Sequence, residues 1–200
     1  RLVHYHLNSL TAASAEGEIG YIDGRRAIVA NLGGSYGKVA ISMRNEGANS
    51  DFDPGTYYIG HDDVKKFNSN PNNGWYLASK DEFLAFYNAY KDHMDPQPHA
   101  IFSGIKVNIG GNILPLPYSG YKPDRSHVID GQESMVSSWT STVHNYRVYA
   151  QDGGVEYRET YWAFLVIDDS SAVSSGLSSG VDEDVPEYSE MPIRLFHRLQ

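Results

Sequence analysis

One segment in the last quarter of the sequence constrains the fold more than any other. Residues 161–167 read Tyr-Trp-Ala-Phe-Leu-Val-Ile, an apolar run without the alternation of polar and apolar residues that marks a half-exposed strand. The run therefore predicts a strand buried on both faces. A chain of 200 residues is long enough to build a sizeable core, and no linker divides it. We expect residues 1–200 to form a single domain.

Two further segments predict hairpins. Residues 27–42 hold two short apolar runs on either side of the glycine-rich turn at 33–37. Residues 105–116 begin with strict alternation, turn at a Gly-Gly-Asn sequence and continue as a second apolar run. Because Pro115 and Pro117 have no amide hydrogen to donate to a ladder, they confine this second strand to an edge or an irregular path.

Helical signals are few. Ser79 and Glu82 form a capping box, in which each side chain can bond to the backbone amide of the other residue. Apolar residues then recur at helical spacing, and Asp95-Pro96 is expected to end the element. A second helix is expected around residues 2–10. The apolar face of the first helix consists of Phe83, Phe86, Tyr87 and Tyr90.

Charge is distributed unevenly. The chain carries 16 basic and 25 acidic residues, a net charge of −9, which argues against nucleic acid and anionic membranes as partners. Between Arg158 and Arg194 there is no Lys or Arg, although eight acidic residues lie there. A solvated acidic loop over residues 168–190 explains this run of negative charge. Calcium binding is the alternative, but the acidic residues do not have the spacing of a calcium-binding loop. Long polar loops are expected at 45–55, 68–74, 118–138 and 170–188.

Cysteine is absent, which excludes disulfides and thiolate chemistry. No apolar run reaches the length of a membrane span. The sequence starts abruptly at Arg1, so we expect an exported protein whose signal or anchor segment has been removed. Tyrosine is frequent, with 15 residues, and it supplies stiff contact surface with a polar tip as well as ordinary sheet packing.

No catalytic constellation is assembled by the motifs. The pattern Gly-x-Ser-x-Gly occurs at 33–37 and at 176–180, but neither has the strand before and helix after that a nucleophile elbow requires. Ser103 starts a Ser-x-x-Lys match without its companion motifs. The eight histidines show no metal-ligand spacing, and we expect neither metal nor cofactor. The three tryptophans, Trp75, Trp139 and Trp162, are expected in the core.

Four short segments, taken in order, resemble the major paralogous domain of Fibrobacter succinogenes and its relatives. Residues 73–83 are similar to the Gly-Trp-Arg-Leu-Pro-Thr-x-x-Glu-Trp segment of that family, and residues 112–121 to its Phe-Leu-Pro-Ala-Ala-Gly-Tyr-Arg segment. Residues 138–142 resemble its Tyr-Trp-Ser-Ser-Thr segment, and residues 192–198 its closing Val-Arg-Leu-Val-Arg-Asp. Ala78 departs from the family by replacing the usual proline.

The resemblance implies an α+β, C-type-lectin-like mixed fold with twisted antiparallel strands, one or two helices and long irregular loops. Members of the family are commonly exported or anchored at the surface of Bacteroidetes and related bacteria. The related formylglycine-generating enzymes use active-site cysteines, so that activity does not carry over. Surface loops hold the ligand contacts in this fold class, which directs attention to the polar, tyrosine-rich segment 143–159. The candidate ligand-binding residues are Asn145, Tyr146, Arg147, Tyr149, Tyr157 and Arg158.

We therefore expect a non-catalytic recognition module, an adhesin-like protein that binds glycan or protein through loops near 139–158. Two alternatives remain open. One is a structural component of a surface appendage or a receptor-binding protein. The other is a carbohydrate-active hydrolase that uses two facing carboxylates. Its candidates are Glu82, Asp130, Glu133, Glu156 and Glu159.

Overall fold

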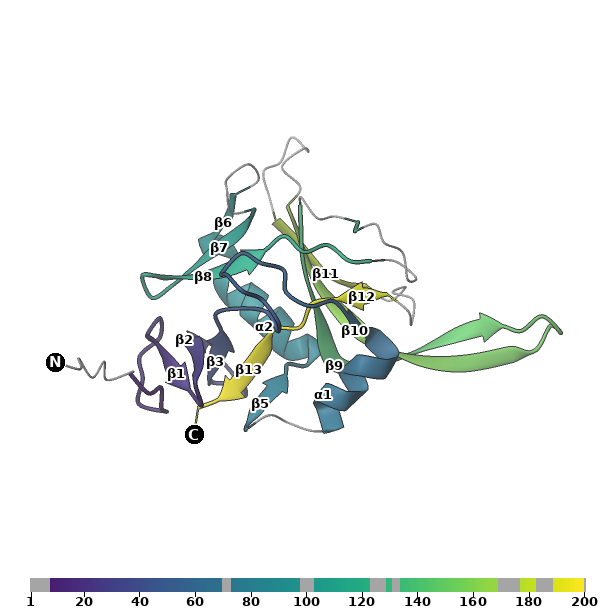
Figure 1. The fold of residues 1–200 in the computed structure, drawn as a ribbon, viewed down its shortest axis with the longest axis horizontal. Helices are drawn as coiled ribbons and strands as arrows, with labels where there is room; N and C mark the ends of the chain where they lie inside the picture. The colour runs from purple at the N-terminus through teal and green to yellow at the C-terminus, as the bar shows by residue number, and fades with distance from the viewer. Residues whose placement is uncertain are drawn as a thin grey trace.

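The protein is a mainly antiparallel α+β structure with two short α-helices in its described parts (Figure 1). The computed structural model describes residues 8–69, 73–97, 103–122, 129–130, 134–168, 177–182 and 189–199. The α+β class expected from the sequence is confirmed at this level.

The largest sheet among the described residues has five strands. Its strand order is β1-β2-β3-β13-β5, and each neighbouring pair is antiparallel. The four residues Ala27–Ala30 of β2 are all 0% exposed, so this sheet is buried on both faces. Its strands are β1 (Ile19–Ile22), β2 (Arg25–Asn31), β3 (Lys38–Ser42), β13 (Leu195–Arg198) and β5 (Trp75–Leu77).

The described residues form three smaller sheets as well. A three-stranded sheet has the order β11-β10-β9, with β10 in the middle, and a second has the order β6-β7-β8. A two-stranded sheet joins β12 to β4. The bounds are β4 (Tyr58–Ile59), β6 (Met94–Gln97), β7 (Gly104–Ile109), β8 (Asn112–Pro117), β9 (Met135–Tyr149), β10 (Val155–Asp168), β11 (Leu177–Asp182) and β12 (Glu190–Met191).

The capping box predicted from the sequence is present at the start of α2 (Lys80–Tyr90). The helix ends earlier than predicted, because a 3₁₀ turn, η2 (Lys91–His93), follows it and the chain then pairs with β7 as β6. Tertiary strand pairing therefore overrides the helical pattern before Pro96. A π-helical turn, η1 (Gly60–Val64), leads into the short helix α1 (Lys65–Ser69).

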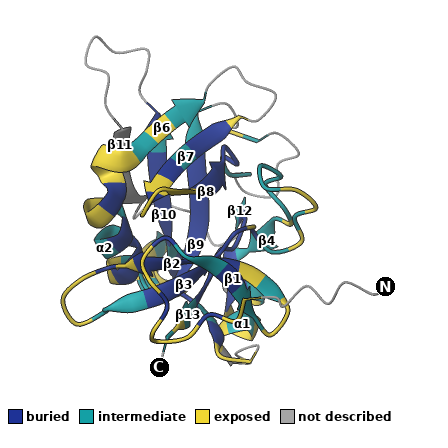
Figure 2. Cartoon of the chain, turned by 90° about the vertical axis from the view of Figure 1, so that its left-hand side faces the viewer, coloured by how far each residue is buried: buried dark blue, intermediate teal, exposed yellow. Residues whose placement is uncertain are grey.

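The core consists of two layers of side chains on opposite faces of the five-stranded sheet. The first layer lies between this sheet, α2, β7 and β8, where Phe83 stacks on Phe164 with ring centroids 4.8 Å apart. The second layer packs Val29, Trp75 and Leu195 against the inner halves of β9 and β10. Figure 2 shows the buried residues concentrated along β2, β3, β9 and β10.

Most predicted strands are confirmed. The two hairpins are β2-β3 and β7-β8, and β8 with its prolines lies at a sheet edge as expected. The run 161–167 is the inner half of β10, lies between two strands and is almost wholly buried. The helix expected around residues 2–10 is wrong for residues 8–10, because Ser9 forms a β-bridge with Tyr21. Residues 1–7 lie outside the described residues.

Trp139 anchors β9 in the second core layer. It is 0% exposed, and its indole nitrogen donates to the carbonyl of Tyr58 at 2.7 Å. The chain after Tyr58 crosses the indole at Gly60, where a Cβ would lie 2.7 Å from the ring. Trp75 is buried as predicted, whereas Trp162 is only partly covered, which corrects the expectation for the third tryptophan.

Replacing Gly60 with alanine tests this crossing. The added methyl group would overlap the Trp139 indole, so we expect Gly60→Ala to lower the free energy of unfolding by about 1–3 kcal/mol in urea denaturation. Gly154→Ala is the matched control, because its Cβ would meet only the carboxylate end of Asp152. Equal stability of the two variants would contradict the close packing at Gly60.

A buried phenol links β8 to β10. The hydroxyl of Tyr118 donates to Asp168 Oδ2 at 2.8 Å, and both residues are buried. Burial raises the pKa of Tyr118 above its ordinary value of 10.0, and the hydrogen bond to Asp168 raises this pKa further. The neutral phenol is therefore the form that the folded state favours.

Tyr118→Phe should lower the free energy of unfolding by about 1–2 kcal/mol near neutral pH. Above pH 10 the unfolded wild-type chain loses the Tyr118 proton while the folded chain retains it, so the advantage of the wild type should shrink as pH rises. Urea unfolding of both proteins at about pH 8 and about pH 11 measures this difference. An advantage that stays constant or grows with pH would contradict the assignment.

Candidate functional site

The outer halves of β9 and β10 form a two-stranded arm that extends away from the rest of the protein (Figure 1). We define the arm as residues 143–159. The third strand of this sheet, β11, pairs with β10 only at residues 163–168, so it does not reach the arm. Seven residues of β9 lie in the arm and span about 20 Å at the rise of an extended strand.

A tight turn closes the arm. The backbone amide of Ala150 donates to the carbonyl of Gly154 at 2.9 Å, and the amide of Gly153 donates back to Ala150 at 3.0 Å. Gly153 has a φ of 83°, which non-glycine residues seldom adopt. Asp152 accepts a bond from the Gly154 amide at 2.9 Å. The turn therefore fixes the register of the two strands.

One face of the arm consists entirely of exposed side chains. Residues that are directly opposed in an antiparallel ladder share a face, so the register of β9 and β10 defines its members. Tyr149 and Tyr157 are 72% and 71% exposed, and Val143 and Val155 are 42% and 48% exposed. We call this surface the exposed arm face; its residues are Val143, Asn145, Arg147, Tyr149, Val155, Tyr157 and Glu159.

Apolar exposure is concentrated on the exposed arm face. Of the five large hydrophobic residues that are exposed in the described parts of the chain, only Ile113 lies elsewhere. Tyr149 opposes Val155, and Tyr157 opposes Arg147, whose guanidinium carbon lies 6.0 Å from the Tyr157 ring centroid. The two tyrosines are therefore diagonal neighbours, close enough for one ligand to touch both. Contiguous apolar exposure of this kind marks interaction sites.

The structure brings together four of the six predicted ligand-binding residues. Asn145, Arg147, Tyr149 and Tyr157 lie on the exposed arm face. Tyr146 and Arg158 oppose each other on the other face of the arm. The expectation of an irregular loop is wrong for this segment, because both sides of the turn pair as regular strands.

Side chains on the opposite face of the arm pack against one another and against the first residue of α2. His144 stacks on Tyr146 with ring centroids 6.3 Å apart and contacts Trp162 at 4.7 Å. The Lys80 ammonium lies 4.0 Å from the Trp162 ring centroid. An ion pair joins Glu156 and Arg158 at 3.7 Å. These contacts partly cover the β9 side chains of the opposite face, whereas every residue of the exposed arm face is exposed.

The carboxylates proposed for a hydrolase do not form a facing pair among the described residues. Glu82 is 4% exposed and serves the helix cap: its Oε2 accepts from the Ser79 amide at 2.9 Å. Glu156 and Glu159 are exposed and lie on opposite faces of the arm. Asp130 is exposed and bridges Tyr121, and Glu133 lies outside the described residues.

Metal-ligating side chains do not gather in threes within the described residues. His4, His6 and the side chain of His61 lie outside them. Asp63 accepts a bond from the Ile59 amide at 3.0 Å. The predicted acidic loop contains β11, while residues 169–176 and 183–188 lie outside the described residues, so calcium binding there stays a prediction.

Sequence reasoning missed the arm as a hairpin, although a signal was present. In the structure, residues 143–149 alternate between exposed and half-buried positions. The sequence signal is the Asp-Gly-Gly turn that follows this strand. Polar and aromatic residues mixed on both faces hid the alternation. The turn composition, combined with strand-forming Val and Tyr on both sides, was the usable signal.

No protein-family model, no curated protein and no solved structure matches the chain. Among the described residues, no helix combines the length and the apolar character needed to cross a bilayer.

Glu82→Gln separates a structural from a catalytic role for the best-buried carboxylate. Its Oε1 accepts from the Tyr76 hydroxyl at 2.8 Å and from Arg198 Nη2 at 2.9 Å, and an amide cannot replace both carboxylate oxygens as acceptors. We expect the free energy of unfolding to fall by about 1–3 kcal/mol. Glu156→Gln, at an exposed position, should stay within about 0.5 kcal/mol of the wild type in the same urea titration. An unchanged stability for Glu82→Gln would refute the structural role.

Proposed function

We propose that the protein is a non-catalytic, exported or cell-surface recognition module that binds glycan or protein through the exposed arm face. A C-type-lectin-like fold is part of this proposal. Its support is the position of the segments that resemble the Fibrobacter domain: a buried Trp139, a capped helix after residues 73–79, and a terminal arginine next to β13.

One observation carries the proposal: two tyrosines more than 70% exposed lie on the same face of a projecting arm. The arm shields little of the core, so the strands beyond residue 143 contribute contact surface more than they contribute stability. Exposing Tyr149, Tyr157, Val143 and Val155 to water costs free energy that covering them with a ligand would recover.

The chemistry of the exposed arm face suits either kind of ligand. Tyrosine rings can stack on sugar rings, while Asn145, Arg147 and Glu159 offer hydrogen-bond donors and acceptors for hydroxyl groups. Tyrosine and arginine are also the residues that carry most energy in protein interfaces. A two-stranded ribbon can insert into a groove on a partner, which a flat sheet cannot do.

Ligand screening tests the proposal. Folded wild-type protein should bind at least one structure on a glycan array, or enrich a defined protein from bacterial or host surface extracts. Tyr149→Ala and Tyr157→Ala should each weaken that binding by about tenfold or more, the loss expected for an aromatic hot spot. Both variants should unfold within about 0.5 kcal/mol of the wild type, because the side chains are exposed.

Glu156→Ala is the control on the same arm, because Glu156 belongs to the opposite face. It should retain wild-type binding. Blank results in both screens would contradict the proposal. Self-association in light scattering that Tyr157→Ala abolishes, together with blank screens, would favour the alternative of a structural component of a surface assembly.

A further inference from the structure

The exposed arm face is small and has clear limits. At the base of the arm Val143 opposes Tyr161, which is 4% exposed, so the accessible surface ends at this pair. At the other end the turn after Tyr149 closes the ribbon. Seven residues make up the face, whereas a standard protein interface uses about 20–30 residues from each partner. The face by itself is therefore too small for a protein partner of ordinary size, and it suits a smaller ligand.

The two exposed tyrosines of this face form a platform and not the wall of a pocket. Tyr149 and Tyr157 are 72% and 71% exposed, and side chains so open to solvent do not enclose a ligand. Within the described residues both long edges of the face are open too, because β9 is an edge strand and β11 does not reach the arm. A ligand therefore lies along this surface and is contacted on one side, rather than being held by one of its ends.

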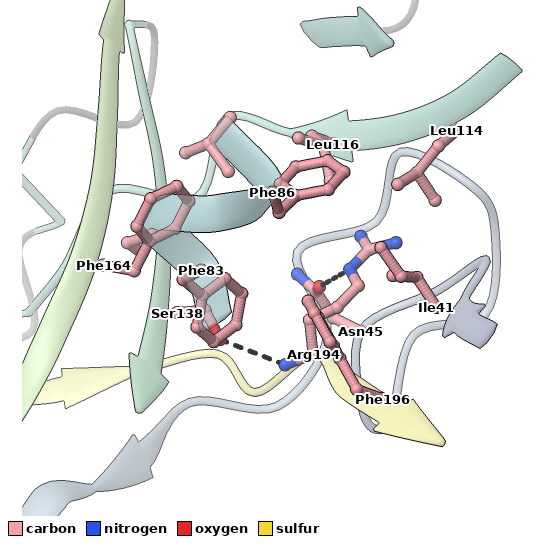
Figure 3. A pocket seen from close by; sticks show the side chains of 12 residues that line it. Ile41, Asn45, Phe83, Phe86, Leu114, Leu116, Ser138, Phe164, Arg194 and Phe196 are labelled. Atoms are coloured by element: carbon pink, nitrogen blue, oxygen red, sulfur yellow. Dashed lines mark hydrogen bonds between the residues drawn. The ribbon is translucent and has the colours of Figure 1, made fainter. Parts of the chain in front are cut away.

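The cavity in the first core layer cannot hold an organic ligand (Figure 3). It is lined by Phe83, Phe164 and the buried Arg194, among others, and its volume is about 20 Å³. Pockets for small organic molecules measure about 300–1,000 Å³. One water molecule fits a cavity of this size, whereas a sugar ring does not. A sugar therefore has to bind at the surface of the protein.

Tyr149 and Tyr157 follow one another along the arm. Tyr149 is paired with Val155 next to the turn, and Tyr157 is paired with Arg147, which lies two residues closer to the base. Diagonal neighbours of this kind have their Cα atoms about 7–8 Å apart. Two aromatic rings placed one after the other on an open ribbon match a chain of repeating units, because each ring can pack against a different unit.

The charge of the arm argues against a polyanionic ligand. Arg147 and Glu159 are the charged residues of the face, and the Arg147 guanidinium carbon lies 6.0 Å from the Tyr157 ring centroid. The whole chain has a net charge of −9, so it repels acidic polymers at long range. Calcium does not suit the face either, because Glu159 supplies a single carboxylate and Ca²⁺ takes about 6–8 oxygen ligands. The face therefore fits an uncharged ligand that binds without a metal ion.

We propose, as an extension that rests on the proposed recognition function, that the exposed arm face binds a neutral, linear oligosaccharide along its side and without calcium. Neighbouring sugar units pack against Tyr149 and Tyr157. Their hydroxyl groups exchange hydrogen bonds with Asn145, Arg147 and Glu159. Because no end of the ligand is enclosed, the recognised element is an internal stretch of a glycan chain. A single sugar reaches one ring, so affinity grows with chain length until both rings are covered.

Titrations with oligosaccharides of increasing length test the proposal. The cello-, xylo-, manno-, malto- and N-acetylchito-oligosaccharides are neutral, linear series whose binding to the folded wild type can be followed by calorimetry or NMR. At least one series should bind, and its longer members should bind about tenfold or more tightly than its monosaccharide, because they cover the second ring. Conversion of the reducing end to an alditol should change the affinity by less than about twofold. Failure of every series to bind, or binding that requires a free chain end, would overturn the proposal.

The conditions of the titration check the chemistry of the ligand. The affinity should stay within about twofold in EDTA and when the sodium chloride concentration is raised, because neither a metal ion nor an ion pair holds a neutral ligand. Heparin and alginate, which are polyanions, should not compete. Loss of binding in EDTA, or binding of acidic glycans alone, would contradict the proposal.

Variants that lack one ring locate the ligand. Tyr149→Ala and Tyr157→Ala should each remove the gain of affinity with chain length, so that short and long oligosaccharides bind about equally, because each variant retains one ring. Tyr149→Phe keeps the ring and should keep the gain. Glu156→Gln is the control on the opposite face of the arm and should behave as the wild type. A length dependence that survives in both alanine variants would refute the site.

Two patterns of results distinguish the ligand class from the proposed function. A protein partner or an acidic glycan whose binding depends on Tyr149 and Tyr157, together with blank titrations of the neutral oligosaccharides, would overturn the neutral glycan and leave the proposed function in place. Blank results for glycans and proteins alike would overturn both.

Discussion

Burial of Trp139 is the constraint on which the rest of the structure depends. Its indole holds the Tyr58 carbonyl, and Gly60 crosses the ring, so the chain before η1 is fixed in place. The backbone of the same strand reaches two other segments: the Trp139 amide donates to Pro192 at 3.1 Å, and the Ser141 amide donates to Ala78 at 2.9 Å. Three regions distant in sequence therefore meet at β9, and the arm begins where those contacts end.

The two-sided core sheet explains why a charge is found in the interior. Strand β13 pairs with both β3 and β5, so the residue that leads into it must pass between the core layers. Arg194 occupies that position, and its guanidinium donates hydrogen bonds to Asn45 and Ser42, which are distant from it in sequence. The guanidinium thus ties the C-terminal strand to the loop after β3. This is a specific, directional link that an apolar side chain would not provide.

Local patterns predicted much of the framework, and tertiary context decided the rest. The capping box at Ser79, the hairpin around residues 33–37 and the buried strand 161–167 follow from spacing and turn chemistry alone. Sheet order does not, because the pairing of β13 with β3 joins residues far apart in sequence. The candidate ligand-binding residues lie in the segment that forms the arm. Neither face of this solvated ribbon is packed into the core, so its sequence shows no alternation of polar and apolar residues that would predict strands. For this reason the sequence pattern predicts a loop where the structure has two strands, and it does not predict that the six residues divide between two faces.

The arm extends beyond the core as a two-stranded ribbon that no third strand reaches. Segments held by ladder bonds and few buried contacts belong to the parts of a protein that open locally at low free-energy cost. Charges at Arg147, Glu156, Arg158 and Glu159 protect its open edges from pairing with other chains. Substitutions on the exposed arm face therefore cost the fold little. Under the proposed function, a lineage that carries this scaffold could change its ligand by altering a few side chains on one ribbon, without having to rebuild the protein beneath it.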